Sequence, residues 1–260
     1  MRKKYPSYML EKHYRAKASI HSIAGGLRDS FDKAYEIGRS TIEVEIREAS
    51  ADYDSLNEAL KDSERYEDGR LSEEALRIID RQVDRGLAIQ YGEEALLALE
   101  EMRLAFLFKS MEISIKEMMS IAFPKLNKKE LFRWDLVTTH LKANGIPVIE
   151  ITGYREANAL RILNNHIKHS FASDQESIGD VACWSSDSEF TYKNLIAFYE
   201  QVKPKVIEFM ENLGNAIVKA VYDLDDASIE AMADEIAGRL STCQATALLK
   251  KVKAKYPDLA

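Results

Sequence analysis

Residues 93–123, EEALLALEEMRLAFLFKSMEISIKEMMSIAF, constrain the fold of this chain more than any other segment. Their apolar residues recur at three- and four-residue steps, the spacing of an α-helix. One side of this helix carries Leu96, Leu99, Met102, Phe106 and Ile113, and another carries Leu104, Leu107, Met111, Ile115 and Met118. Pro124 is expected to end the helix because proline cannot donate a backbone hydrogen bond. A helix that is apolar this far round is expected at the centre of a bundle or in a dimer interface.

Glycine and proline are scarce, with 11 Gly and 5 Pro in 260 residues, and this scarcity favours helices over short strands and turns. Further helices are expected over 8–37 with a break at Gly25-Gly26, 71–91 with an interruption at Gly92, 128–145 capped by Asn144-Gly145, 156–171, 191–223 with a kink or break at Pro204, and two short ones within 226–257. The alternation of Ile42, Val44 and Ile46 with charged residues predicts a short strand over 40–50. Residues 146–151 are expected to be extended. The sequence therefore predicts an all-α fold with at most a small β element.

Three regions are expected along the chain. Residues 1–92 are a mostly helical N-terminal region, residues 93–223 form a helical bundle, and residues 224–260 form a C-terminal helical appendage of lower apolar density.

Charge and cysteine content exclude several classes of protein. The 36 basic and 43 acidic residues give a net charge of −7, which argues against a broad nucleic-acid surface but allows a small basic pocket. Cys183 and Cys243 are isolated, so no disulfide scaffold is expected and a reducing cytoplasm is the default. No signal peptide is predicted, and the longest apolar run, residues 104–108, is too short to span a membrane. There is no Gly-rich phosphate loop, and no cofactor is predicted.

The predicted helix over 156–171 contains the segment RILNNHIKHS (161–170), the only place where residue types suggest chemistry. On a helical wheel, Leu160, Leu163, Ile167 and Phe171 gather on a core-facing side. Five polar residues share an arc of roughly 100° on another side, and these are Asn158, Arg161, Asn165, Lys168 and His169. Asn164 falls toward the apolar side, where it needs a hydrogen-bond partner, and His166 lies at the edge of the polar arc.

Arg161, Asn165 and His169 follow one another at four-residue steps, so they form a row of a guanidinium, a carboxamide and an imidazole. Such a row fits metal-free cleavage of RNA, because Arg161 can stabilise phosphorane charge while an imidazole transfers protons to or from ribose oxygens. A single imidazole cannot easily serve both proton transfers, and a two-fold dimer would supply a second one. The alternative is a buried polar network or a solvated helix face. His166 and His169 could also hold a metal, but no acidic partners support it, and no metal is predicted.

The segment LRILNNHIKHS resembles the signature helix of the HEPN superfamily (higher eukaryotes and prokaryotes nucleotide-binding domain). That signature is usually Arg, a gap of four to six residues and then His, often with Asn directly after the Arg. LAFLFKSMEISIKEM, with Glu112, resembles the first core helix of several such domains. WDLVTTHLKANGI resembles the helix and turn before the signature, and 191–223 resembles the helix that closes the bundle. The resemblance covers residues 93–223.

The resemblance implies a four- or five-helix bundle, a homodimer whose signature helices meet, and metal-independent endoribonuclease activity. His169 matches the signature histidine, because Asn165 precedes it by four residues. Asn164 stands where the Arg usually sits, and Arg161 lies eight residues before His169. Arg161 and His166 have the four-residue gap, but the wheel separates them. Phe171 stands where some members carry a modifiable Tyr, so that mode of modification is not supported.

Two hypotheses follow. In the first, the protein is a ribonuclease toxin or antiphage effector with catalytic residues His169, Arg161 and Asn165. Its substrate-binding residues would be Asn158, Lys168, His166 and Asn164. In the second, catalysis has been lost and the domain dimerises or binds a nucleotide or RNA. Both hypotheses leave room for a protein partner such as an antitoxin or a sensor, which residues 1–92 could contact.

Overall fold

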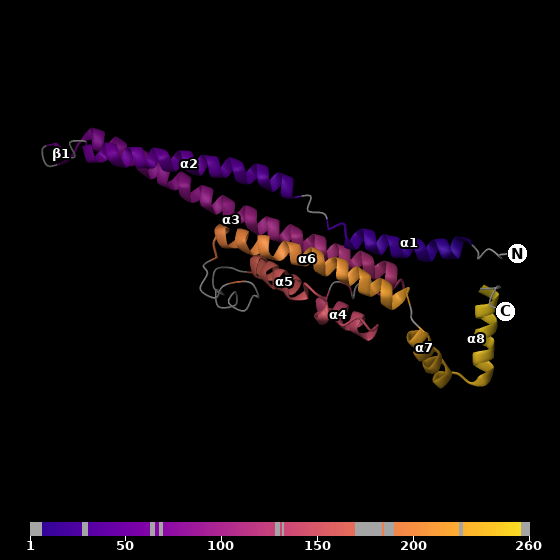
Figure 1. The fold of residues 1–260 in the computed structure, drawn as a ribbon. Coiled ribbons are helices and arrows are strands. Elements are labelled where there is room, and N and C mark those ends of the chain that lie inside the picture. The colour runs from indigo at the N-terminus through magenta and orange to yellow at the C-terminus, as the bar shows by residue number, and fades with distance from the viewer. Residues whose placement is uncertain are drawn as a thin grey trace. The chain divides into compact units, whose positions relative to one another are not determined.

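The computed structural model describes residues 7–27, 31–62, 66–67, 70–127, 131, 133–169, 184, 190–223 and 226–255. The described residues form eight α-helices, which are α1 (Ser7–Ala24), α2 (Asp32–Asp62), α3 (Glu73–Ala122), α4 (Trp134–Ala143), α5 (Tyr154–His169), α6 (Tyr192–Val221), α7 (Asp226–Arg239) and α8 (Thr242–Lys255) (Figure 1). Strands β1 (Tyr66–Glu67) and β2 (Arg70–Leu71) pair antiparallel between α2 and α3. The predicted all-α fold class is therefore confirmed, as are the two short C-terminal helices.

The chain divides into two compact units. The first unit contains Met1–Leu27, Met111–Tyr154 and Lys205–Ala260, and the second contains Arg28–Ser110 and Arg155–Pro204. Helices α3 and α6 contribute residues to both units.

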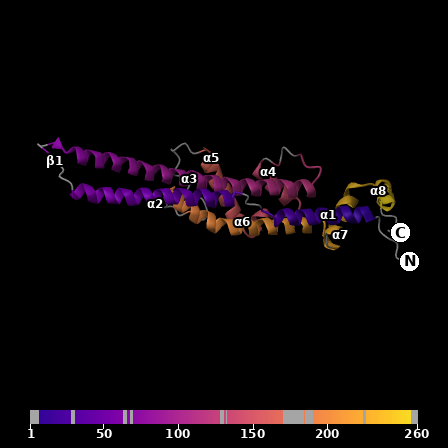
Figure 2. The same cartoon turned by 90° about the horizontal axis from the view of Figure 1, so that it is seen from above.

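In the second unit, α2 and the first part of α3 lie side by side and run antiparallel (Figures 1 and 2). Gln82 donates to Asn57 at 3.3 Å, and Arg85 pairs with Asp52 at 3.2 Å. Further along, Gly92 of α3 faces Ile46 of α2.

The predicted strand over 40–50 is wrong, because these residues lie within α2. Ile42 and Ile46 are four residues apart, so they share a face of a helix as readily as they share a face of a strand. Both are half-buried, whereas Val44 between them is exposed. The apparent alternation therefore combined two inward residues with one that faces solvent.

The predicted interruption at Gly92 is also wrong, because α3 is continuous from Glu73 to Ala122. A Cβ atom at Gly92 would lie 2.4 Å from Cγ1 of Ile46, closer than packing allows. Gly92 thus permits the close approach of α2 rather than ending a helix. The prediction that the helix stops before Pro124 is confirmed. Helix α6 likewise continues through Pro204 without a break.

Only one of the two apolar sides predicted for 93–123 is buried. Leu104, Leu107, Met111, Ile115 and Met118 are all at most 3% exposed. On the other side, Leu96 is buried, but Met102, Phe106 and Ile113 are exposed. A single chain therefore covers one face of α3 and leaves part of the second face open.

In the first unit, α1 packs closely on α6. A Cβ atom at Gly214 would lie 2.5 Å from Cβ of Ala24, and the side chains of Ile20 and Met118 lie within 4 Å of it. An ion pair of 2.5 Å between Lys17 and Asp223 links α1 to the segment that follows α6. Within the part of the chain that the structure describes, no helix combines the length and apolar character that crossing a membrane requires.

Two glycines with positive φ shape the connection from α4 to α5. Gly145 (φ 78°) follows Asn144, the residue that caps α4, and the predicted helix end there is confirmed. Val148–Glu150 form a 3₁₀ helix, so the extended segment predicted for 146–151 is wrong. Gly153 (φ 86°) directly precedes α5, and a Cβ atom there would lie 2.3 Å from the backbone oxygen of Lys205. Helix α5 can therefore begin where it does only if residue 153 lacks a side chain.

Replacing these glycines with alanine is expected to have unequal effects on stability. Gly153→Ala combines left-handed backbone strain with overpacking, and it should lower the free energy of unfolding by about 2–5 kcal/mol. Gly145→Ala carries strain alone, because no atom lies within 4 Å of its Cβ position, and it should cost about 1–2 kcal/mol. Urea denaturation of both variants measures the difference, and equal costs would contradict the packing argument.

Candidate functional site

Helix α5 turns one side into the core of the second unit. Ala157, Ala159, Leu160 and Leu163 are all buried, as the wheel predicted for Leu160 and Leu163. Ile167 is half-buried, and Phe171 lies outside the described residues. The burial of this side fixes the direction in which the polar residues of α5 point.

Arg161 and Asn158 form a half-buried pair on the polar side of α5. Nε of Arg161 donates to Oδ1 of Asn158 at 3.0 Å, a geometry available to residues one turn apart. This bond orients the guanidinium and leaves its two terminal nitrogens as donors. No carboxylate of the described residues forms an ion pair with Arg161. A guanidinium held in place by a neutral partner is well suited to receive an anion from outside the protein.

The polar side continues with Asn165 and Lys168, which are both exposed. The ammonium of Lys168 lies 5.6 Å from the ring centroid of Phe108, a cation–π contact, and no carboxylate among the described residues pairs with it. Helix α5 contains Arg155, Arg161 and Lys168 against one acidic residue, Glu156, so it carries a formal charge of +2 in a chain of −7. This local excess of positive charge favours anions.

Asn164 points toward the core, away from the polar side of α5. Its side chain is 0% exposed, and neither Oδ1 nor Nδ2 has a hydrogen-bond partner within the described residues. The wheel placed it correctly on the apolar side. Asn164 therefore faces the core, whereas its neighbour Asn165 faces solvent.

His166 is half-buried and packs near Phe190, with ring centroids 6.2 Å apart. It lies five residues after Arg161, which corresponds to about 140° around the helix. The structure thus groups Arg161 with Asn158 and does not bring His166 to them.

The side chain of His169 lies outside the described residues, although α5 extends to this position. The predicted row of Arg161, Asn165 and His169 is therefore described for its first two members only. No group of three His, Cys, Asp or Glu side chains in the described ranges is arranged to hold a metal ion.

A cluster around Arg103 in the second unit was not predicted from any local sequence pattern. The Arg103 side chain is 6% exposed, and its guanidinium carbon lies 3.9 Å from the ring centroid of Tyr35 and 3.6 Å from that of Tyr199. It is thus placed between two aromatic rings that come from α2 and α6. Four carboxylates lie within 4.0 Å of it, and these are Asp32, Glu36, Glu100 and Glu200.

The hydrogen bonds of this cluster link α2, α3 and α6. The hydroxyl of Tyr35 donates to Oε1 of Glu100, which is 1% exposed. Asp32 accepts from the hydroxyl of Tyr199 at 3.0 Å and from Lys203. Burial raises the pKa of Glu100, and burial together with the hydrogen bond and charge of Glu100 raises the pKa of Tyr35 to about 12. A signal in the sequence is that Glu100 and Arg103 lie within residues 93–123, the segment predicted to have two apolar sides.

Removing the Arg103 charge should strongly destabilise the protein. Arg103→Met leaves Glu100 buried without its cation, and we expect the free energy of unfolding to fall by about 3–5 kcal/mol. Arg77→Met is the matched control, because Arg77 forms an exposed ion pair with Glu73 that is worth about 0–1 kcal/mol. Denaturant titration of both variants measures the effects, and a loss at Arg103 as small as at Arg77 would contradict a supporting role for the cluster.

The Tyr35 phenol should make stability depend on alkaline pH. Its pKa of about 12 in the folded protein exceeds the ordinary value of 10.0, so the unfolded chain ionises first as pH rises. The resulting contribution to stability is complete below pH 10.0 and is lost as pH rises to about 12. Tyr35→Phe lacks this group, so the stability difference between wild type and variant should shrink across that range in urea titrations. A constant difference would contradict the raised pKa.

Comparisons of this chain with protein-family models, with curated proteins and with solved structures found no match. Its function is therefore inferred from its own residues.

Proposed function

We propose that the polar side of α5 binds RNA and that the protein is a metal-independent endoribonuclease of the HEPN type. The observation that carries this proposal is the Arg161 guanidinium, which Asn158 orients and no described carboxylate neutralises. Exposed Asn165 and Lys168 extend the same side, and the helix carries a local charge of +2. RNA phosphates are anions that a planar guanidinium can bind through two parallel hydrogen bonds.

The proposed reaction is attack of a ribose 2′-hydroxyl on the adjacent phosphorus. An imidazole takes the 2′ proton, the new P–O bond forms, and the bond from phosphorus to the 5′-oxygen breaks. A second acid protonates the departing 5′-oxygen, which leaves a cyclic phosphate and a 5′-hydroxyl. Arg161 and Lys168 would stabilise the phosphorane charge, and Asn165 would orient a ligand oxygen. The resemblance to the HEPN signature assigns the imidazole to His169.

Two proton transfers require two acid–base groups, and α5 has one histidine in its polar row. A homodimer in which two α5 helices meet would supply His169 from each copy. We propose this arrangement for a cytoplasmic toxin or antiphage effector, with an antitoxin or sensor protein as a further partner.

A second candidate function is an RNA- or nucleotide-binding and dimerising module without catalysis. Asn164 favours it, because this neutral and fully buried residue occupies the position where the signature arginine usually sits. The polar side of α5 would then hold phosphates without cleaving them.

A cleavage assay on total cellular RNA, in the presence of a chelator, tests the first candidate. Wild-type protein should cleave RNA, and both His169→Ala and Arg161→Ala should abolish cleavage. Binding of RNA to His169→Ala should stay near the wild-type level, whereas Arg161→Ala should weaken it about tenfold or more because a charge-assisted contact is lost. Arg155→Ala is the matched control, since Arg155 is an exposed arginine of the same helix about 120° away from Arg161.

The outcomes separate the two candidates. Binding that depends on Arg161, without cleavage by any variant, supports the module and removes the nuclease. Cleavage that persists equally in His169→Ala contradicts the proposed catalytic residue. Absence of both binding and cleavage removes both functions.

A further inference from the structure

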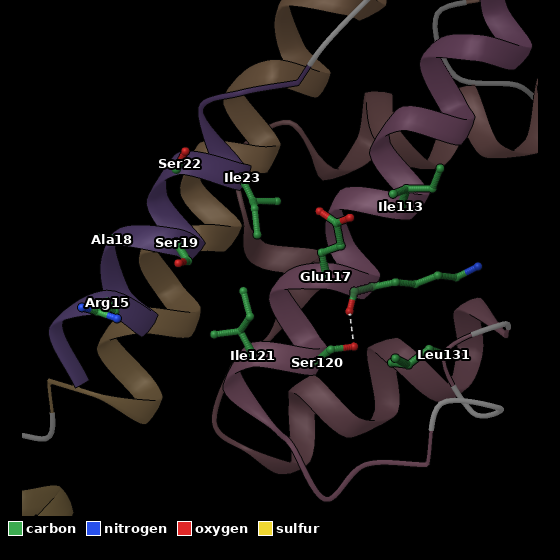
Figure 3. Close-up of a pocket in the computed structure, with 11 residues that line it drawn as sticks. Arg15, Ala18, Ser19, Ser22, Ile23, Ile113, Glu117, Ser120, Ile121 and Leu131 are labelled. Carbon is green, nitrogen blue, oxygen red and sulfur yellow. Dashed lines mark hydrogen bonds between the residues drawn. The ribbon is translucent and has the colours of Figure 1, made fainter. Parts of the chain in front are cut away.

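The first unit contains an open groove of about 1000 Å³ between α1 and the last part of α3 (Figure 3). Ile23 of α1 and Ile121 of α3 point into the same space, and Ile113 and Leu131 extend this apolar lining. Arg15, Lys116 and Glu117 are the charged lining residues, so the groove lining carries two cations and one carboxylate. Ile113 is 44% exposed, so the groove accounts for one end of the uncovered side of α3.

Helix α7 carries a complementary surface. Ile229, Met232 and Ile236 recur at three- and four-residue steps on one side of it. They are 54%, 49% and 39% exposed. A row of three exposed apolar side chains at this spacing is the usual anchor set of a helix that binds in a groove.

The two surfaces agree in length. The groove walls run from Arg15 to Ile23 and from Ile113 to Ile121, and at 1.5 Å per residue each wall is about 12 Å long. The anchors from Ile229 to Ile236 span about 10.5 Å by the same measure. A helical face of two turns therefore matches the groove.

The charges of the two helices are also complementary. Helix α1, which forms one wall, contains Lys12, Arg15 and Lys17 against Glu11, and it stays basic although Lys17 also pairs with Asp223. Helix α7 contains Asp226, Glu230, Asp234 and Glu235 against one basic residue, Arg239. Opposite charges on the two helices favour their association and oppose pairing of α7 with another α7.

We propose that α7 of a second copy of this chain docks in the groove, and that the contact is reciprocal about a two-fold axis. Within one chain, α7 contributes no residue to the groove lining, and its three anchors stay exposed. In a two-fold dimer each copy donates one helix and offers one groove, so the apolar contact forms twice. The proposed contact uses no residue of α5, so it is separate from the α5 contact of the proposed nuclease, and disulfide trapping tests it independently of RNA binding or cleavage.

Sedimentation equilibrium of the full chain tests the proposal. Wild-type protein should be a dimer at micromolar concentration, and Ile236→Asp should weaken dimerisation about tenfold or more. Ile149→Asp is the matched control, because Ile149 is 69% exposed in the same unit and lies outside both surfaces. Equal urea midpoints for both variants would show that the fold is intact. A monomeric wild type, or equal effects of both substitutions, would overturn the proposal.

Disulfide trapping identifies the copy that supplies α7. One chain carries Ser19→Cys and another carries Met232→Cys, both in a background with Cys183→Ser and Cys243→Ser. Oxidation of the mixture should produce a disulfide between the two chains, whereas each chain alone should cross-link far less. If only a single chain with both cysteines closes on itself, α7 occupies its own groove and the proposal is wrong.

Discussion

The guanidinium of Arg103 lies between the rings of Tyr35 and Tyr199, and the second unit depends on this contact. It joins three helices that are distant in sequence, and it neutralises Glu100 in a place that water does not reach. A buried cation beside a buried carboxylate is costly to form and more costly to disrupt, since loss of Arg103 would leave Glu100 buried without its cation. The polar side of α5 belongs to the same unit. The unit that contains this side therefore has an ionic centre at Arg103 as well as an apolar core.

The periodic features of the fold could be predicted from the sequence. The helical wheel placed Leu160, Leu163 and Asn164 of α5 on the apolar side, and all three are buried, but it could not tell which of the two apolar sides of α3 is buried. It could not separate a strand from a helix over 40–50, because Ile42 and Ile46 satisfy both periods. Gly92 was misinterpreted because its role depends on Ile46 of another helix, which local sequence does not reveal.

In the candidate site, contacts within one helix could be predicted from the sequence, whereas contacts between helices could not. The pair of Arg161 and Asn158 joins residues one turn apart, so the wheel could place both on one side. The Arg103 cluster combines residues from α2, α3 and α6, and no local pattern brings them together. The net charge of the whole chain, −7, likewise does not reveal that α5 carries a formal charge of +2. Average properties of the chain therefore give little information on the face of α5 for which we propose anion binding.

Helix α3 belongs to both compact units without an interruption. A continuous helix forms cooperatively, because each hydrogen bond depends on the ordering of its neighbours. Loss of order at Gly92 would weaken the turns of α3 that follow, and Arg103 lies on these turns. The two units thus share one continuous helix. We expect the backbone amides of α3 to exchange slowly on both sides of residue 110, rather than only within one unit.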